Sequence, residues 1–187
     1  MGKSRISGMK KYFVFILIFW SCQLFAQQTF RTEMGEIQFD ASTPLEDIYA
    51  INEKVNLILR DDGEIAVLLL VKEFDFKRKL MQEHFNENYV ESDKYPKAYF
   101  TGKIDSFSLD KLTAESHSFI LRGELTLHGV TRPVVTEVSI SREEDTLNLR
   151  TEFIAKTEDY KIKVPKILFM KVGKEVQVSV SAQLNQT

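Results

Sequence analysis

The chain has 187 residues, of which 43% are hydrophobic and 28% charged, a composition that suits one globular domain with little room for a second. The formal net charge of −2 excludes recognition of nucleic acid through a strongly basic field. The single cysteine excludes a disulfide within the chain and a zinc site built from several cysteines.

The N-terminal segment, residues 1–26, has the three parts of a secretory signal peptide. Four basic residues and no acidic one precede an almost wholly apolar run, Tyr12–Phe25, and the small residue Ala26 follows. The run has 14 residues, whereas a membrane-spanning helix needs about 20. We therefore expect cleavage after Ala26, a periplasmic or secreted mature domain of residues 27–187, and no stable membrane span after cleavage.

Two details of this segment leave alternatives open. Met9 is followed by two lysines and would also make a normal start for a signal peptide. Cys22 is either discarded with the signal peptide or becomes a lipid-modified N-terminus, and the bulky residues before it favour the first alternative. Cleavage removes four of the 25 basic residues and none of the 27 acidic ones, so the mature net charge is about −6.

Most of the mature chain alternates apolar and polar residues with the period of two that is typical of strands. The alternating segments are Glu36–Phe39, Lys54–Arg60, Ser118–Leu127, Val134–Ile140, Leu147–Phe153 and Glu175–Val180. The segments between them that we expect to form turns are Asp61–Gly63, His128–Pro133 and Glu143–Asp145.

Three segments depart from this alternation. Ile65–Val71 is continuously apolar, which predicts a strand that is buried on both faces or packs under another element. Gly123 lies within a long strand, where glycine often marks a bulge or a tight bend. In Lys77–Tyr89 apolar residues recur every four positions, which predicts a short helix, and Tyr95–Pro96 ends this insertion.

These elements predict an all-β fold. About eight strands in mainly up-and-down order favour a closed, eight-stranded antiparallel barrel, because closure removes the open edges of the sheet. The helical segment is a short insertion into the barrel. A barrel of this size can hold one small or slender ligand, but a filled and a hollow barrel have the same alternation.

No constellation of catalytic residues is evident in the sequence. It contains no Gly-x-Ser-x-Gly elbow and no glycine-rich phosphate loop. His84 and Glu87 are one helical turn apart, but two ligands do not make a metal site. We interpret His128 as a residue that braces the turn before Gly129. The sequence therefore predicts a protein that is not an enzyme and needs no cofactor or metal.

The 14 phenylalanines are either plain core or the lining of an apolar channel for a lipid chain. Those spread over the strands and the insertion are Phe74, Phe76, Phe85, Phe100, Phe107 and Phe119. Inward-facing positions of the expected strands are our candidates for contact with such a ligand. They are Leu57, Leu59, Val67, Leu69, Phe119, Leu121, Leu125, Val138 and Val178.

Two motifs carry a resemblance to a known family. Asn86–Phe100 contains Asn-Tyr-Val-Glu-Ser-Asp-Lys-Tyr-Pro, and Gly123–Val134 contains Leu-Thr-Leu-His-Gly-Val-Thr-Arg-Pro. Together they resemble the YceI-like family of bacterial exported proteins, over most of Gly35–Leu184. Met81–Phe85 resembles the short form of the family that is common in Bacteroidetes-type bacteria. The resemblance implies a lipocalin-like barrel that binds a long isoprenoid chain, of polyprenyl or quinone type, without catalysis.

Two segments depart from the family pattern. Phe30–Ile37 lacks the tryptophan and the His-Ser pair that are frequent in the first strand, and Glu158–Pro165 replaces a commoner segment with Arg and Gly-Ile. We therefore expect the barrel to be kept, whereas the departures leave room for a ligand that differs from that of other members. The rival hypothesis is a non-catalytic interaction module of the cell envelope with a filled barrel. A homodimer through one barrel face is left open.

Overall fold

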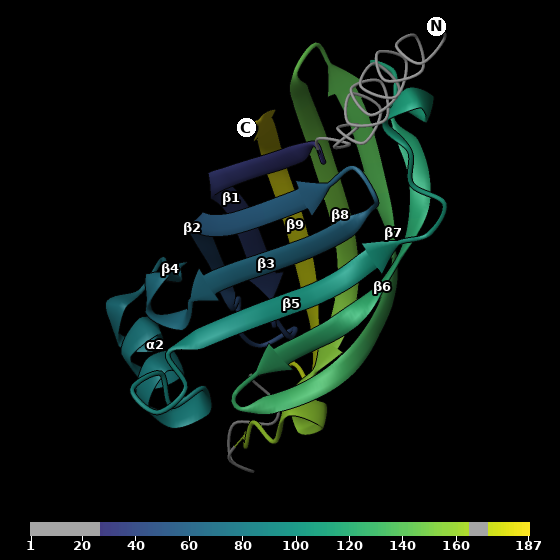
Figure 1. Ribbon diagram of the computed structural model, residues 1–187. Coiled ribbons are helices and arrows are strands. Elements are labelled where there is room, and N and C mark those ends of the chain that lie inside the picture. The colour runs from purple at the N-terminus through teal and green to yellow at the C-terminus, as the bar shows by residue number, and fades with distance from the viewer. Residues whose placement is uncertain (1–26, 165–171) are drawn as a thin grey trace, which may run out of the picture.

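The computed structural model describes residues 27–164 and 172–187 (Figure 1). The predicted signal peptide, with Met9, Cys22 and the cleavage position after Ala26, lies outside these residues. Within them, no helix is long and apolar enough to cross a membrane.

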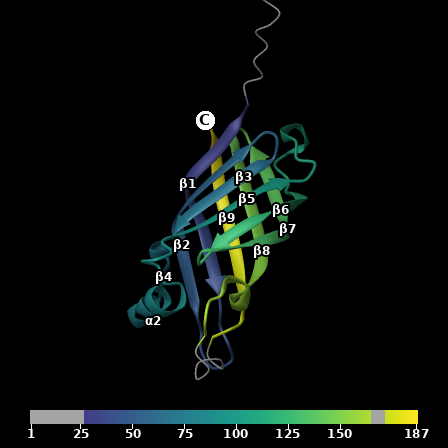
Figure 2. The same ribbon diagram turned by 60° about the horizontal axis from the view of Figure 1, so that its bottom comes forward.

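Eight antiparallel strands close into a barrel (Figures 1 and 2). They are β1 (Thr29–Asp40), β2 (Tyr49–Arg60), β3 (Glu64–Leu70), β5 (Lys97–Ile104), β6 (His117–Leu127), β7 (Val130–Glu143), β8 (Thr146–Lys156) and β9 (Glu175–Gln186). Their order around the barrel is β1-β9-β8-β7-β6-β5-β3-β2, and the pairing of β1 with β2 completes the ring. The two-residue strand β4 (Asp75–Phe76) pairs with the start of β2. The predicted eight-stranded barrel is confirmed.

The insertion between β4 and β5 is helical, as the four-residue spacing predicted. The helix α2 (Lys79–His84) continues into a π-helical turn, Phe85–Tyr89, and lies beside one end of the barrel (Figure 1). Three short 3₁₀ turns, Val71–Glu73, Leu109–Lys111 and Thr157–Tyr160, complete the elements of the described residues.

The turn between β6 and β7 is shorter than the sequence predicted. It consists of His128 and Gly129 alone, with φ of 52° and 71°, which are the positive values that a two-residue hairpin turn of this kind requires. A Cβ atom on Gly129 would also lie 2.6 Å from the ring of Tyr95. Pro133, which the sequence analysis placed in the turn, belongs to β7.

The prediction that β3 is buried on both faces is wrong. Ile65 and Leu69 are buried, but Leu68 and Leu70 are 39% and 45% exposed. The wall of a barrel is a single layer, so one face of β3 meets the interior and the other meets solvent. The continuously apolar sequence of β3 therefore does not indicate burial of both of its faces.

The expected bulge at Gly123 is also absent, because the strand register runs unbroken through this residue. Gly123 pairs with Gly102 on β5 and with Val134 on β7. The ring of Phe100 occupies the space that side chains would take at both glycines. A Cβ on Gly123 would lie 2.4 Å from Phe100 Cζ and 2.4 Å from the Thr101 carbonyl oxygen.

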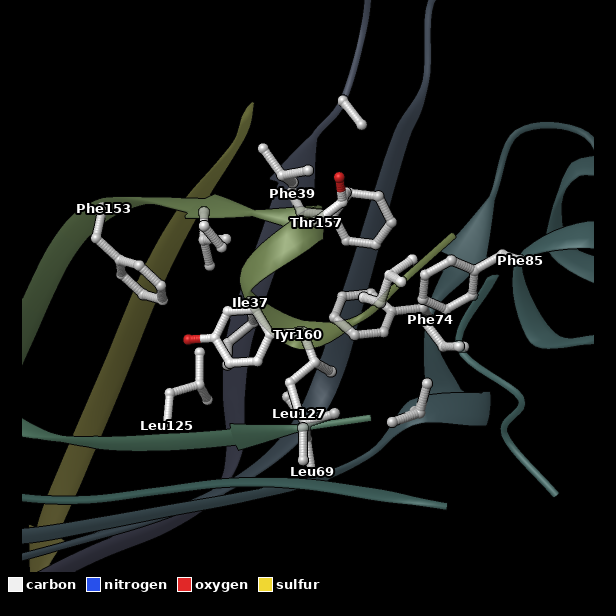
Figure 3. Close-up of a pocket in the computed structure, with 18 of the residues that line it drawn as sticks. Ile37, Phe39, Leu69, Phe74, Phe85, Leu125, Leu127, Phe153, Thr157 and Tyr160 are labelled. Atoms are coloured by element: carbon white, nitrogen blue, oxygen red, sulfur yellow. The ribbon is translucent and has the colours of Figure 1, made fainter. Parts of the chain in front are cut away.

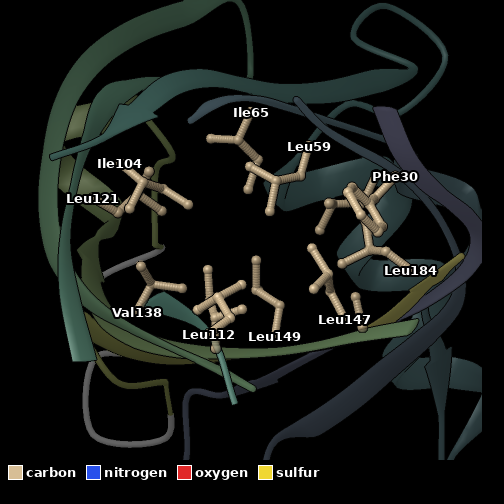
Figure 4. Packing of buried hydrophobic residues seen from close by; sticks show 13 residues of the cluster. Phe30, Leu59, Ile65, Ile104, Leu112, Leu121, Val138, Leu147, Leu149 and Leu184 are labelled. Atoms are coloured by element: carbon tan, nitrogen blue, oxygen red, sulfur yellow. The ribbon is translucent and has the colours of Figure 1, made fainter. Parts of the chain in front are cut away.

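The interior of the barrel is closely packed at the end nearest the β2–β3 turn. Figure 4 shows these side chains converging from the surrounding strands. We call this cluster the packed end. It comprises Phe30, Leu57, Leu59, Ile65, Ile104, Leu112, Leu121, Val138, Ile140, Leu147, Leu149, Ala182 and Leu184.

We expect Gly123→Ala to destabilise the fold by about 1–3 kcal/mol, the usual effect of overpacking, because a backbone oxygen and an inward-facing ring both oppose the new methyl group. Urea unfolding measures this change as a shift of the midpoint. The control Glu124→Gln alters the exposed neighbouring side chain and should change stability by less than about 0.5 kcal/mol. Equal midpoints for the two variants would contradict the close packing at Gly123.

Candidate ligand-binding cavity

The barrel half beyond the packed end encloses a cavity of about 540 Å³. This volume falls in the range of about 300–1,000 Å³ that is typical of small-molecule sites. All eight barrel strands, α2 and the Thr157–Tyr160 turn contribute to its largely apolar wall (Figure 3). Leu80 and His84 on α2 line it although both are exposed, so the cavity opens on the side of α2. The barrel is thus filled at one end and hollow at the other.

The predicted ligand contacts divide between the two halves of the barrel. Those that line the cavity are Leu57, Val67, Leu69, Leu121, Leu125 and Val178, and of these Leu57 and Leu121 also belong to the packed end and lie at its border with the cavity. Leu59 and Val138 lie in the packed end, and Phe119 packs against it. Alternation identifies the inner face of a strand, but it carries no information on depth along the barrel axis. Contact with a ligand stays a prediction for all nine residues.

Four phenylalanines form a ring cluster at the α2 side of the cavity. Phe39 lies 5.1 Å from Phe74 and 5.4 Å from Phe85, between ring centroids, and Phe76 lies 5.0 Å from Phe85. All four line the cavity. Phe74, Phe76 and Phe85 were among the residues noted in the sequence, whereas Phe39 was not singled out.

The other phenylalanines noted in the sequence divide between the cavity and the packed end. Phe100 lines the cavity, whereas Phe107 and Phe119 pack against the packed end, with ring centroids 5.8 Å apart. The two readings of the phenylalanines, core and channel lining, therefore each apply to part of the set.

A few polar groups reach the cavity. Thr136 Oγ1 donates a hydrogen bond to the Glu152 carbonyl and Thr151 Oγ1 donates one to the Glu137 carbonyl, both at 2.7 Å. Tyr160 is 3% exposed, and burial raises the pKa of its phenol above the ordinary value, so the hydroxyl remains protonated. The sequence analysis missed Tyr160, because its segment has no periodicity and stood out only as a departure from a family pattern.

One rim of the cavity is held by His128, which joins three segments. Its Nδ1 lies 2.9 Å from the Tyr160 carbonyl oxygen, its Nε2 lies 2.9 Å from Glu91 Oε2, and its ring packs edge-on against Tyr95. The Tyr160 carbonyl and the Glu91 carboxylate are both hydrogen-bond acceptors, so each faces one ring nitrogen of His128. His128 therefore braces the turn before Gly129 and ties it to Glu91 and to the Thr157–Tyr160 turn.

The structure brings no further metal-ligating side chain to the pair His84 and Glu87 among the described residues. Among residues 27–164 and 172–187, no three side chains of His, Cys, Asp or Glu come close enough together to hold a metal ion. His84 is exposed at the mouth of the cavity. Nearby, the ion pair between Arg78 and Glu46, at 2.7 Å, also contributes to the mouth.

We expect the Glu91 contact to stabilise the fold in a pH-dependent way. The hydrogen bond from His128 lowers the pKa of the Glu91 carboxyl below its ordinary value of 4.5. The contribution is therefore fully present above about pH 4.5 and is lost as the pH falls through the lowered value. Glu91→Gln should be less stable than the parent near neutrality, and this difference should shrink on acidification.

Urea unfolding at a series of pH values from about 7 to about 3 measures this prediction. Glu87→Gln, at an exposed position of the adjacent helical turn, is the matched control and should follow the parent throughout. A stability difference between Glu91→Gln and the parent that is constant over the series would contradict the assignment.

Comparison with known proteins finds one family model and bacterial relatives that match this chain. The model of the YceI-like domain family matches residues 24–184. A UPF0312 protein of Photorhabdus laumondii is 26% identical over 116 residues, which are 62% of this chain. The matched region spans 48% of that relative's length.

Solved structures share the fold at low sequence identity. A polyisoprenoid binding domain from Saccharophagus degradans, implicated in plant cell wall breakdown, superposes with a TM-score of 0.75 at 13% identity and covers 85% of this chain and 98% of its own. BcnA of Burkholderia cenocepacia gives a TM-score of 0.67 at 15% identity, with 80% and 95% covered. The YceI protein of Campylobacter jejuni gives 0.54 at 16% identity, with 66% and 72% covered.

Proposed function

We propose that this chain, which belongs to the YceI-like domain family, is an exported protein that sequesters or carries a long isoprenoid or a similar amphiphile in its barrel. The observation that carries the proposal is the apolar cavity of about 540 Å³ inside a closed barrel. The fold likeness to a domain described as polyisoprenoid binding supports the choice of ligand class. The basic and apolar N-terminal segment supports export.

Burial of the ligand's chain would supply the binding free energy. Each methylene group transferred from water to the cavity contributes about 0.8 kcal/mol, and the cavity is already formed, so little rearrangement opposes binding. The packed end limits how deep the chain can reach. A long chain would therefore occupy the cavity with one part and leave the barrel through the mouth beside α2.

The rival function, an interaction module with a filled barrel, is favoured by one observation on the outer surface. Ile58, Leu68, Leu70 and Tyr99, on the neighbouring strands β2, β3 and β5, are between 39% and 46% exposed. The cavity favours lipid binding over the interaction module, because the interaction module was expected to have a filled barrel.

The decisive experiment is mass spectrometry of organic extracts from the protein purified out of its native envelope without detergent. One dominant isoprenoid or related amphiphile, near equal stoichiometry with the protein, is the expected result. A folded and monodisperse sample that contains no lipid would overturn the proposal and favour the interaction module.

A substitution that fills the cavity tests where the ligand lies. Val178 lines the middle of the cavity, and we expect Val178→Trp to weaken binding of the apolar dye N-phenyl-1-naphthylamine about tenfold, which corresponds to about 1.4 kcal/mol. The matched control is Met34→Trp, at a position that is 83% exposed on β1 and lines neither pocket.

The sequence's single tryptophan, Trp20, lies in the predicted signal peptide, so the emission of each introduced tryptophan reports its own surroundings. We expect blue-shifted emission for the Val178 variant and red-shifted emission for the Met34 variant. Unchanged dye affinity in a folded Val178→Trp protein with blue-shifted emission would place the ligand elsewhere.

A further inference from the structure

The wall of the barrel is not paired along its whole length between β7 and β8. The ladder that joins these strands runs from the pair Glu143–Thr146 to the pair Val138–Thr151 and ends there. Within the described residues, the remainder of β7 pairs with β6 alone and the remainder of β8 with β9 alone. A second, smaller pocket lies in this gap and is lined by both strands and the Thr157–Tyr160 turn. We call it the β7–β8 slot.

The slot is bounded by specific contacts. At one end are the two bonds from Thr136 Oγ1 and Thr151 Oγ1 to carbonyls of the opposite strand. At the other end Arg132 Nε donates a hydrogen bond of 3.0 Å to the Asp159 carbonyl. Between them lies Pro133, which has no N–H for a ladder, so this part of β7 has the character of an edge strand. The opening is therefore encoded in the sequence of β7.

Tyr160 connects the slot with the cavity, because its side chain lines both. The residue is 3% exposed, yet its hydroxyl has no hydrogen-bond partner among the described residues. Figure 3 shows the hydroxyl directed toward the space between Phe153 and Leu125. The hydroxyl is therefore accessible to a molecule in the cavity, and the bond from His128 to the Tyr160 carbonyl holds the residue in place.

The two cationic side chains that line the slot, Lys156 and Arg132, have partners. Lys156 Nζ lies 3.4 Å from Glu175 Oε1, and Arg132 is bonded to the Asp159 carbonyl. The unpartnered group is therefore a neutral hydrogen-bond donor that faces an apolar space. The chemistry that satisfies it is an uncharged acceptor on a largely apolar molecule.

We propose that Tyr160 anchors the head of the bound amphiphile by donating a hydrogen bond from its hydroxyl to an uncharged acceptor, such as a carbonyl oxygen, beside the β7–β8 slot. The chain of the ligand then runs through the cavity toward Phe85 and α2, on the opposite side in Figure 3. This inference rests on the proposed function, because it presumes an amphiphile in the cavity.

Three probes with the same farnesyl chain test the anchor: the hydrocarbon farnesene, the ketone farnesylacetone and the anion farnesyl diphosphate. Each is titrated against bound N-phenyl-1-naphthylamine. We expect the parent to bind the ketone about tenfold more tightly than the hydrocarbon. Tyr160→Phe should abolish this preference, because it removes the hydroxyl and keeps the ring. The control Tyr49→Phe, at an exposed tyrosine outside the cavity, should keep the preference.

A spectroscopic readout separates a bound carbonyl from a general change in packing. Compared with farnesylacetone in an apolar solvent, the infrared carbonyl stretch of the bound ketone should lie at lower wavenumber in the parent. It should be unshifted in Tyr160→Phe. Equal ketone affinity and equal stretch in the two proteins, with all probes still displacing the dye, would overturn the anchor and leave the proposed function standing. Failure of every probe to bind the parent would count against the proposed function itself.

The anionic probe, farnesyl diphosphate, tests the alternative that the head of the ligand lies at the α2 mouth of the cavity. Diphosphate binding stronger than ketone binding, and lost in Arg78→Ala but kept in Tyr160→Phe, would put an anionic head at the α2 mouth and overturn the anchor. The expected result is that farnesyl diphosphate binds more weakly than the ketone in the parent.

Discussion

Closure of the sheet through β1 is the constraint on which the rest of the structure depends. β1 pairs with β2 along one edge and with β9 along the other, so a single strand joins the two ends of an otherwise open sheet. Closure satisfies the edge hydrogen bonds and fixes the width of the interior at a value that side chains can just fill. Whether such an interior is full or hollow then depends on the size of the inward side chains.

That size differs between the two ends of this barrel. At the packed end the inward residues are mostly leucine and isoleucine, with Phe30 among them. At the other end β9 contributes Val176, Val178 and Val180, and alanines stand at Ala98 and Ala155. Smaller side chains on the same width of barrel leave space, and the four-phenylalanine cluster lines one side of it. A half-filled barrel combines a stable core with a preformed cavity.

The two motifs noted in the sequence meet at the rim of this cavity. His128, in the β6–β7 turn, reaches Glu91 in the insertion, and the ring of Tyr95 covers Gly129. The same imidazole binds the Tyr160 carbonyl. The motifs therefore act as determinants of the fold, and they also position Tyr160, a buried residue that lines the cavity. A packing role and a role in ligand recognition are compatible in these residues.

The sequence by itself determined the barrel, the helical insertion and the inward face of each regular strand, because these depend on periods of two and of about four residues along the chain. The predicted burial of β3 on both faces and the predicted bulge at Gly123 were wrong, since an apolar run does not show which layer lies opposite and a glycine does not show which ring fills the space beside it. Only the tertiary structure decided which inward residues line the cavity, where β7 and β8 part, and that Tyr160 lines the cavity. These depend on depth along the barrel and on contacts between segments distant in sequence, and no local pattern encodes either.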